Sequence, residues 1–219
     1  PARLFSLLLG FALVVAAPTS PAWQARPAAI PVSTVEVPAL VNDLEQRSFR
    51  FFWDSANPAN GLIPDHYPGE SFSSIAAVGF GLTAYGVGVE RGYITREQAI
   101  ERTLATLRFF DTAPQNDSED DASGYRGFFY HFLDMDSGKR FARWTELSTV
   151  DTTLLLGGVL FAQSYYDRDT PAEHEIRELA DRIYRRVDWP WAQARPPLVS
   201  MGWTPEGKFI PHDWEGYNE

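Results

Sequence analysis

Two stretches of this chain are apolar on every side of a helix, and they constrain the fold more than any other feature. They are residues 75–82 (IAAVGFGL) and 154–160 (LLLGGVL), within longer helical patterns at residues 73–90 and 149–165. A helix that has no polar face must be covered by other elements all round. The small residues in both stretches also allow neighbouring helices to approach closely. We therefore expect both helices to lie inside the domain.

Three further helical patterns have one polar face each. One covers residues 39–55, one begins at the capping box Thr95–Gln98, and one begins at Thr170 with Pro171 in the first helical position. The apolar face of the first is made of Leu40, Val41, Leu44, Phe51 and Phe52. Helices buried all round thus alternate with half-exposed helices, a pattern typical of an inner ring wrapped by an outer ring, an α/α toroid. Five helices cannot close such a ring, so we expect the N-terminal half of a larger barrel, poorly soluble or molten when isolated.

Short β-hairpins interrupt the helices. Residues 127–144 alternate aromatic and other side chains around a turn at Asp136–Lys139, and residues 198–211 form a second candidate hairpin around Pro205–Gly207. The predicted fold class is therefore all-α with small β-hairpin insertions.

The first 38 residues differ in composition from the rest. Arg3 precedes an apolar run at residues 4–17, followed by small residues, which is the order of a secretory signal. About fourteen apolar residues are fewer than the roughly twenty of a membrane-spanning helix, although an N-terminal membrane anchor is the alternative. We predict a signal peptide at residues 1–25, a Pro/Ala-rich linker at 26–38 and one domain at 39–219. This organisation predicts an exported protein, periplasmic or secreted, without membrane contact after cleavage.

Composition excludes several classes of function. A net charge of −10 argues against a nucleic-acid partner, which requires clustered cations. The absence of cysteine excludes disulfides, thiolate catalysis and thiolate metal sites. The aromatic share of 14% is high, and surplus rings either line sugar or nucleobase sites or fill a bulky core. The acidic loop at residues 116–121 is either a calcium site or, more simply, a solvated run of charge, since no complete EF-hand spacing is present.

Carboxylates beside aromatic residues are the best candidates for chemistry. Glu146 follows Trp144 and stands just before the capping pattern Ser148–Asp151, in which Asp151 has a structural duty and Glu146 has none. Glu215 follows Trp214 in a similar setting. Glycosidic bond cleavage needs two carboxyl groups, one protonated and one ionised. The same features also fit a non-catalytic glycan-binding protein.

Two other kinds of site are disfavoured. No Gly-x-Ser-x-Gly elbow of a serine hydrolase occurs. The four histidines, at positions 66, 131, 174 and 212, are scattered and not spaced as a metal-binding pair. We therefore predict neither a metal nor another cofactor.

Six motifs in the same order resemble the bacterial glucoamylase-like family, which includes the endo-β-1,2-glucanases of glycoside hydrolase family 144. The motifs are FRFFW at 49–53, SIAAVGF at 74–80, VERGY at 89–93, GFFYHFLD at 127–134, TELSTVDT at 145–152 and WEGYNE at 214–219. The resemblance implies an (α/α)6 barrel, an inverting mechanism and a β-glucan substrate outside the cytoplasm. Related domains in cyclic β-1,2-glucan synthases make transglycosylation a neighbouring activity.

The resemblance also implies roles for individual residues. Glu146 and Glu215 correspond to the essential acids, with the roles of acid and base unassigned. The residues expected to bind the sugar are Asp134, Arg91, His131, Trp144, Trp214 and Tyr217. The expected partner is an oligo- or polysaccharide, and the complete protein is expected to be a monomer.

Overall fold

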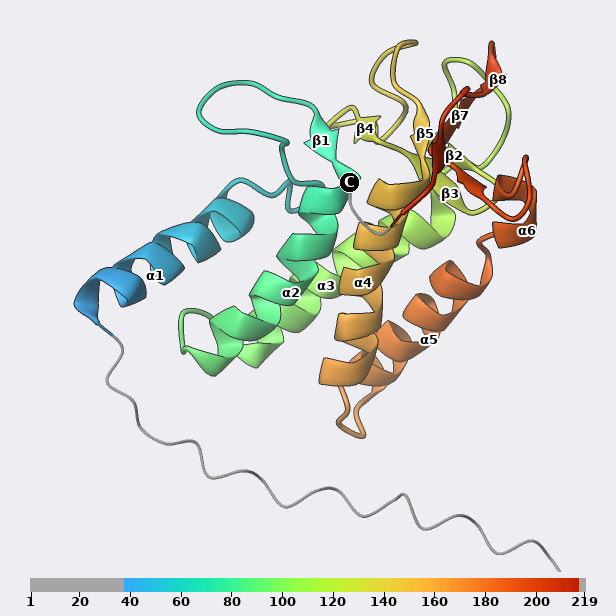
Figure 1. Ribbon diagram of the computed structural model, residues 1–219. Coiled ribbons are helices and arrows are strands. Elements are labelled where there is room, and N and C mark those ends of the chain that lie inside the picture. Colours follow the sequence, from blue (N-terminus) through green and yellow to red (C-terminus); the bar gives the residue numbers. More distant parts are fainter. Residues whose placement is uncertain (1–37, 217–219) are drawn as a thin grey trace, which may run out of the picture. The chain divides into compact units, whose positions relative to one another are not determined.

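The computed structural model describes residues 38–216 (Figure 1). The predicted signal peptide, almost all of the predicted linker, and Tyr217 lie outside the described residues. In the described range, no helix is both long and apolar enough to cross a membrane.

Among residues 38–216, six helices form the body of the domain. They are α1 (Ala39–Asp54), α2 (Ile75–Glu90), α3 (Arg96–Thr112), α4 (Thr149–Tyr165), α5 (Pro171–Arg185) and the short α6 (Trp189–Ala192). The first five agree with the predicted helices to within about two residues, because side-chain caps mark where most of them begin. Thr95 and Gln98 form the predicted capping box of α3, and Thr170 caps α5. The single turn of α6 was not predicted.

The two apolar helices, α2 and α4, pack side by side with their N-termini at the same end (Figure 1). Their backbones touch at two glycines. A Cβ atom at Gly158 would lie 2.1 Å from the carbonyl oxygen of Gly79, and one at Gly79 would lie 2.3 Å from that of Leu154. Helices α1, α3 and α5 pack around this pair, with α3 against α5. The predicted all-α fold with a central α2–α4 pair is therefore present.

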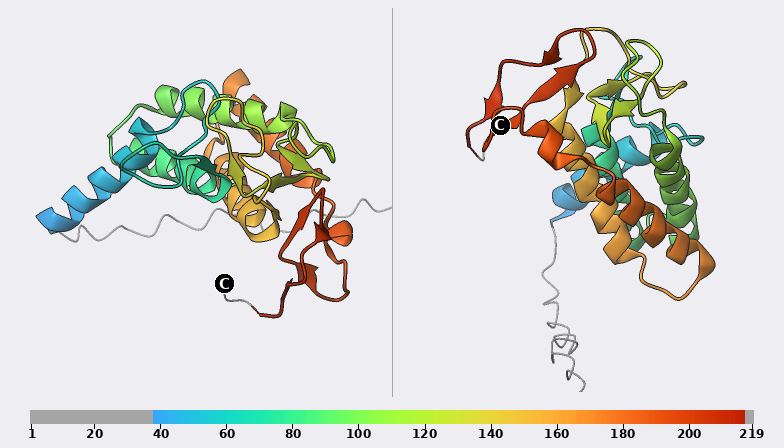
Figure 2. Two further views of the ribbon diagram at one scale, coloured as in Figure 1. Left: turned by 90° about the horizontal axis from the view of Figure 1, so that it is seen from above. Right: turned by 90° about the vertical axis from the view of Figure 1, so that its right-hand side faces the viewer.

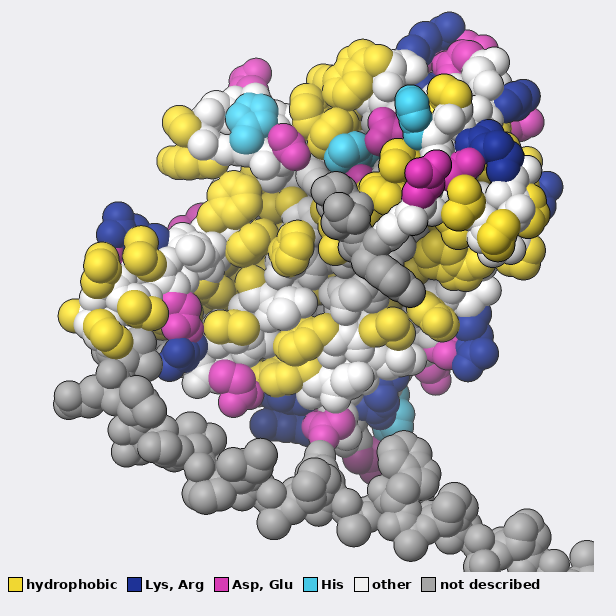
Figure 3. Space-filling view, in the orientation of Figure 1, with side chains coloured by type: hydrophobic (Ala, Val, Ile, Leu, Met, Phe, Trp, Pro, Cys, Tyr) yellow, Lys and Arg dark blue, Asp and Glu magenta, His cyan; other side chains and the backbone are white. Residues whose placement is uncertain are grey.

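The prediction that α2 and α4 are covered all round is wrong for the described residues. Phe80 is 55% exposed and Leu160 36%, on a surface where apolar side chains gather over α2 and α4 (Figure 3). The predicted apolar face of α1 is also open at its N-terminal end, where Leu40 is 66% exposed. The physical reason is that α1, α3 and α5 leave one side of the α2–α4 pair uncovered.

In the described part of the chain, nine short strands gather at one end of the helices (Figure 2). One antiparallel sheet has the order β2-β3-β5-β7-β8, and two strand pairs, β1–β4 and β6–β9, lie beside it. The strands are β1 (Ser73–Ser74), β2 (Gly124–Tyr125), β3 (Phe128–Tyr130), β4 (Phe132–Leu133), β5 (Leu147–Ser148), β6 (Val199–Ser200), β7 (Gly202–Thr204), β8 (Lys208–Phe209) and β9 (Asp213–Trp214).

Of the two predicted hairpins, only the second has the expected pairing. Strands β7 and β8 pair around Pro205–Gly207. In the first, the chain changes sheets at His131, so that β3 pairs with β2 and β5 while β4 pairs with β1. The predicted turn is closed by a bridge between Leu133 and Arg140 and by backbone hydrogen bonds of Asp134 with Lys139 and Gly138.

The acidic loop at residues 116–121 is held by cations of the following segment. Arg143 forms ion pairs with Glu119 and Asp120, at 2.7 and 2.8 Å, and Lys139 pairs with Asp121 at 2.5 Å. The group of potential metal ligands found among residues 38–216 lies elsewhere. These acids and their partners are exposed, so the structure agrees with the simpler prediction of a solvated run of charge, here paired with cations at the surface.

Candidate active site

The candidate site lies where α2 and α4 begin and the strands cross above them. Ser74 caps α2 by accepting from the backbone N–H of Ala77, and Ser148 caps α4 by accepting from that of Asp151, at 3.4 and 3.2 Å. Glu146 stands two residues before the α4 cap. The local sequence thus places a carboxylate at a helix entrance, as predicted.

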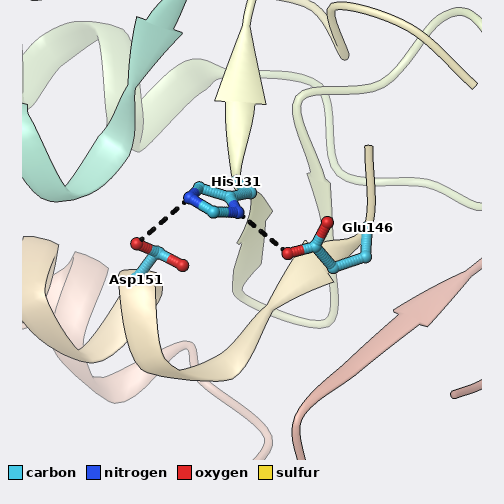
Figure 4. Close-up of side chains that lie close together, drawn as sticks. All are labelled: His131, Glu146 and Asp151. Atoms are coloured by element: carbon cyan, nitrogen blue, oxygen red, sulfur yellow. Dashed lines mark hydrogen bonds and ion pairs between the residues drawn. The ribbon is translucent and has the colours of Figure 1, made fainter. Parts of the chain in front are cut away.

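Glu146 is fixed by both its backbone and its side chain. Its carbonyl oxygen accepts from the backbone N–H of His131 at 2.9 Å, which extends the pairing of β3 with β5. Its Oε1 atom lies 2.9 Å from Nδ1 of His131 (Figure 4), and its side chain is 29% exposed. On the other side is Gly202, where a Cβ atom would come within 2.9 Å of Glu146 Cγ. The side chain therefore has a defined position and remains open to solvent.

Asp151 approaches the same imidazole from the opposite ring edge (Figure 4). Its Oδ1 atom lies 3.5 Å from Nε2 of His131, an ion-pair distance rather than a short hydrogen bond. Its Oδ2 atom accepts a 2.6 Å hydrogen bond from the Ser148 hydroxyl. Burial works against a charge on His131, but the hydrogen bond with Glu146 and the charge of Asp151 outweigh it and raise the pKa of His131 above its ordinary value.

Together, His131, Glu146 and Asp151 are the described residues with ligand atoms close enough to hold a metal ion. The donor set, one imidazole and two carboxylates, is chemically suitable for a divalent cation. However, the carboxylates contact different ring nitrogens, and one ion cannot replace both contacts. The arrangement is better explained by an imidazole hydrogen-bonded between two carboxylates.

Aromatic rings extend from this cluster to the surface. The ring of Phe132 stacks on His131, with centroids 3.8 Å apart and planes at 19°. Trp144, which is 61% exposed, lies against Phe132, Phe72 and Phe141. Such flat, partly exposed rings suit a ligand with a flat apolar face, as a sugar ring has.

The second predicted acid, Glu215, lies in a segment attached to the start of α4. The indole N–H of Trp214 donates to the Thr149 hydroxyl at 2.9 Å, and β9 pairs with β6. A cleft of about 500 Å³ lies between Met201, His212 and Trp214, with Glu215 exposed on its wall. Trp214 is thus attached to Thr149, the residue after Ser148, and Glu146 precedes Ser148 by two residues, so both lie near the start of α4.

Two predicted sugar-binding residues have other surroundings. Arg91 follows the last residue of α2 and binds Glu45 at 2.6 and 2.8 Å. Because α2 has 16 residues, Arg91 lies about 24 Å from the end at which Glu146 is found. Asp134 accepts hydrogen bonds from the backbone N–H and the hydroxyl of Ser137, at 2.8 and 2.7 Å. It therefore stabilises the turn that was predicted at Asp136–Lys139.

The sequence did not reveal that Asp151 belongs to the cluster. Its position three residues after Ser148 identified it as a capping residue only. In the structure the same spacing presents its carboxylate to His131. The signal that could have found it is His131, which directly follows the strand that pairs with the segment before the cap.

Solved structures with a similar fold include candidate glucoamylases and β-1,2-glucanases. No family model matches the chain. Solved structures similar to it include a candidate glucoamylase from Bacteroides uniformis (TM-score 0.74, 30% identity, 82% of this chain and 43% of that one). Another is an endo-β-1,2-glucanase from Chitinophaga pinensis in complex with sophorotriose and glucose (TM-score 0.70, 26% identity, 81% of this chain and 43% of that one).

A curated relative is similar over the same part of the chain. It is an exo β-1,2-glucooligosaccharide sophorohydrolase of Parabacteroides distasonis, 30% identical over 188 residues. The match covers 82% of this chain and 25% of the relative, so the chain spans about a quarter of that protein's length. These similarities confirm the predicted resemblance to the glucoamylase-like family.

Proposed function

We propose that this chain is the N-terminal half of an (α/α)6 barrel in a bacterial glycoside hydrolase that cleaves β-1,2-glucan. The β-1,2-glucan-cleaving relatives support the substrate class. The uncovered apolar side of α2 and α4 supports the half-barrel, since it offers the surface on which the remaining inner helices would pack. The signal-like residues 1–25 support a periplasmic or secreted location.

The observation that carries the catalytic proposal is the convergence of two acidic segments on the N-terminus of α4. Glu146 precedes the cap by two residues, and Glu215 follows the tryptophan that is hydrogen-bonded to Thr149. Both acids are accessible from solvent, as a polymer substrate requires. We assign them as the two carboxyl groups that act on opposite sides of the scissile bond.

An inverting reaction would then proceed in one displacement. One carboxyl group protonates the glycosidic oxygen, while the other carboxylate removes a proton from the water that attacks the anomeric carbon. A separation of about 6.5–9.5 Å between the carboxyl groups leaves room for this water. Trp144 and the rings beside it would support the sugar on the exposed side of Glu146.

The test is Glu146→Gln in the full-length protein. The amide retains the shape of the side chain but neither ionises nor transfers a proton, so release of sophorooligosaccharides from linear β-1,2-glucan should fall by about 10²–10⁴-fold. The melting temperature should change little, since this side chain is partly exposed. Glu101→Gln, on the exposed face of α3, is the matched control and should keep full activity.

Two outcomes would contradict the proposal. Unchanged turnover in Glu146→Gln would remove Glu146 from the reaction. Saturable glucan binding by the wild-type protein with no product after long incubation would indicate a glycan-binding protein instead.

A further inference from the structure

His131 is held more firmly than a surface histidine, and by elements that are distant in sequence. Its backbone N–H donates to Glu146 at 2.9 Å, and its carbonyl oxygen accepts from the N–H of Ile75, the first residue of α2, at 3.2 Å. Its ring rests on Phe132. The strand crossing, a helix start and an aromatic ring therefore fix the orientation of the imidazole.

Both nitrogens of this fixed ring face carboxylates. A neutral imidazole has one donor nitrogen and one acceptor nitrogen, so in that form a lone pair would point at either Glu146 or Asp151. Only the doubly protonated ring interacts favourably with both. Asp65, on the segment between α1 and β1, adds a third and more distant negative charge.

Asp151 is in turn a fixed counter-ion. The residue is 7% exposed, lies in the first turn of α4 and accepts the Ser148 hydroxyl. A helix N-terminus favours negative charge, so this position in the first turn of α4 suits a counter-ion. Ser148, Asp151, His131 and Glu146 thus form a continuous chain of polar contacts that leads outward from the buried helix start.

We propose that Asp151 and His131 form a positioning dyad, in which Asp151 holds the imidazolium and its Nδ1–H holds Oε1 of Glu146. The inference deepens the proposed function and rests on it. Within residues 38–216, the other oxygen, Oε2, has no hydrogen-bond partner and is left for substrate or water. The dyad therefore fixes the Glu146 carboxylate, and activity depends on the proton of His131.

The first test is independent of activity. The pKa of His131, followed by NMR of the imidazole in the full-length protein, should lie above the ordinary value for histidine and should fall in both Asp151→Asn and Glu146→Gln. Asparagine at position 151 still accepts from Ser148, so the helix cap is retained. An ordinary or lowered pKa in the wild-type protein, or no change in Asp151→Asn, would overturn the proposal.

The second test separates positioning from mere structure. His131→Ala removes the hydrogen bond to Glu146, and kcat/KM on β-1,2-glucan should fall by about 10- to 100-fold, the range for a hydrogen bond to a charged group. His131→Asn places an amide N–H near the former Nδ1, so it should restore part of this loss. Activity should decline at alkaline pH partly because His131 loses its proton, and because the amide does not titrate, this part of the decline should be missing in His131→Asn.

The matched control is His174→Asn. This exposed histidine also contacts a carboxylate, Asp169 at 2.6 Å, but lies on α5 outside the site. It should change neither rate nor pH profile. If activity declines at alkaline pH in the same way in His131→Asn and in the wild-type protein, this would contradict the role of the His131 proton. If the wild-type protein releases no sugar at all, the proposed function fails, while the NMR titration still decides whether the charged dyad exists.

Discussion

The contact between α2 and α4 can be tested by adding a single methyl group. In Gly158→Ala the new Cβ atom would lie 2.1 Å from the carbonyl oxygen of Gly79, more than 1 Å inside the normal contact distance. The clash is with backbone, which cannot rotate away as a side chain can, so the two helices must move apart. Overpacking of this kind lowers the free energy of unfolding by about 1–3 kcal/mol. Replacing glycine with alanine also improves helix propensity, which offsets about 1 kcal/mol of this loss.

Gly157→Ala is the control for this prediction, because it changes the neighbouring residue of the same helix in the same way. A Cβ atom at Gly157 has no heavy atom within 4 Å among the described residues, so this substitution leaves the contact between α2 and α4 unchanged. Urea denaturation of the two full-length variants should therefore give a lower midpoint for Gly158→Ala than for Gly157→Ala. Equal midpoints for the two variants would refute the close approach of α2 and α4.

Two further predictions concern the substrate surface and an internal ion pair. Trp144→Ala should raise KM for β-1,2-glucan while leaving the melting temperature nearly unchanged, because the ring is largely exposed; an unchanged KM would remove Trp144 from the sugar-binding surface. The second prediction is pH dependence from Glu173, whose side chain is 1% exposed: its hydrogen bonds with Arg96 hold the pKa of the carboxyl below 4.5 in the folded state. The contribution of Glu173 to stability is therefore present above pH 4.5 and lost as the pH falls through the folded pKa. Glu173→Gln should destabilise the protein at pH 7 and should weaken the loss of stability that the wild-type protein shows on acidification. An unaltered loss of stability at acidic pH would contradict this.

The helices were predictable because their signals are local. Ser148 and Thr95 mark where α4 and α3 begin, and the all-apolar stretches identified the inner pair. The pairing of the strands was not predictable in the same way. Alternation along residues 128–133 shows which side chains share a face, but it does not show that the chain changes partner at His131.

The candidate site was predictable only in part, for the same reason. Glu146 stood out because no local role explained it, whereas Asp151 had a sufficient role as a capping residue. Its second role depends on His131, which lies 20 residues earlier in the chain. Arg91 was placed near the site by resemblance alone, and its ion pair with Glu45 at the other end of α2 could not be read from the sequence.

Product analysis of the full-length protein on a panel of glucans tests the central claim most directly. The account predicts that linear β-1,2-glucan is cut to sophorooligosaccharides and that β-1,3- and α-1,4-glucans are left intact. It also predicts that Glu146→Gln releases product about 10²–10⁴-fold more slowly. Release of sugar from an α-glucan, or no release from β-1,2-glucan, would contradict it.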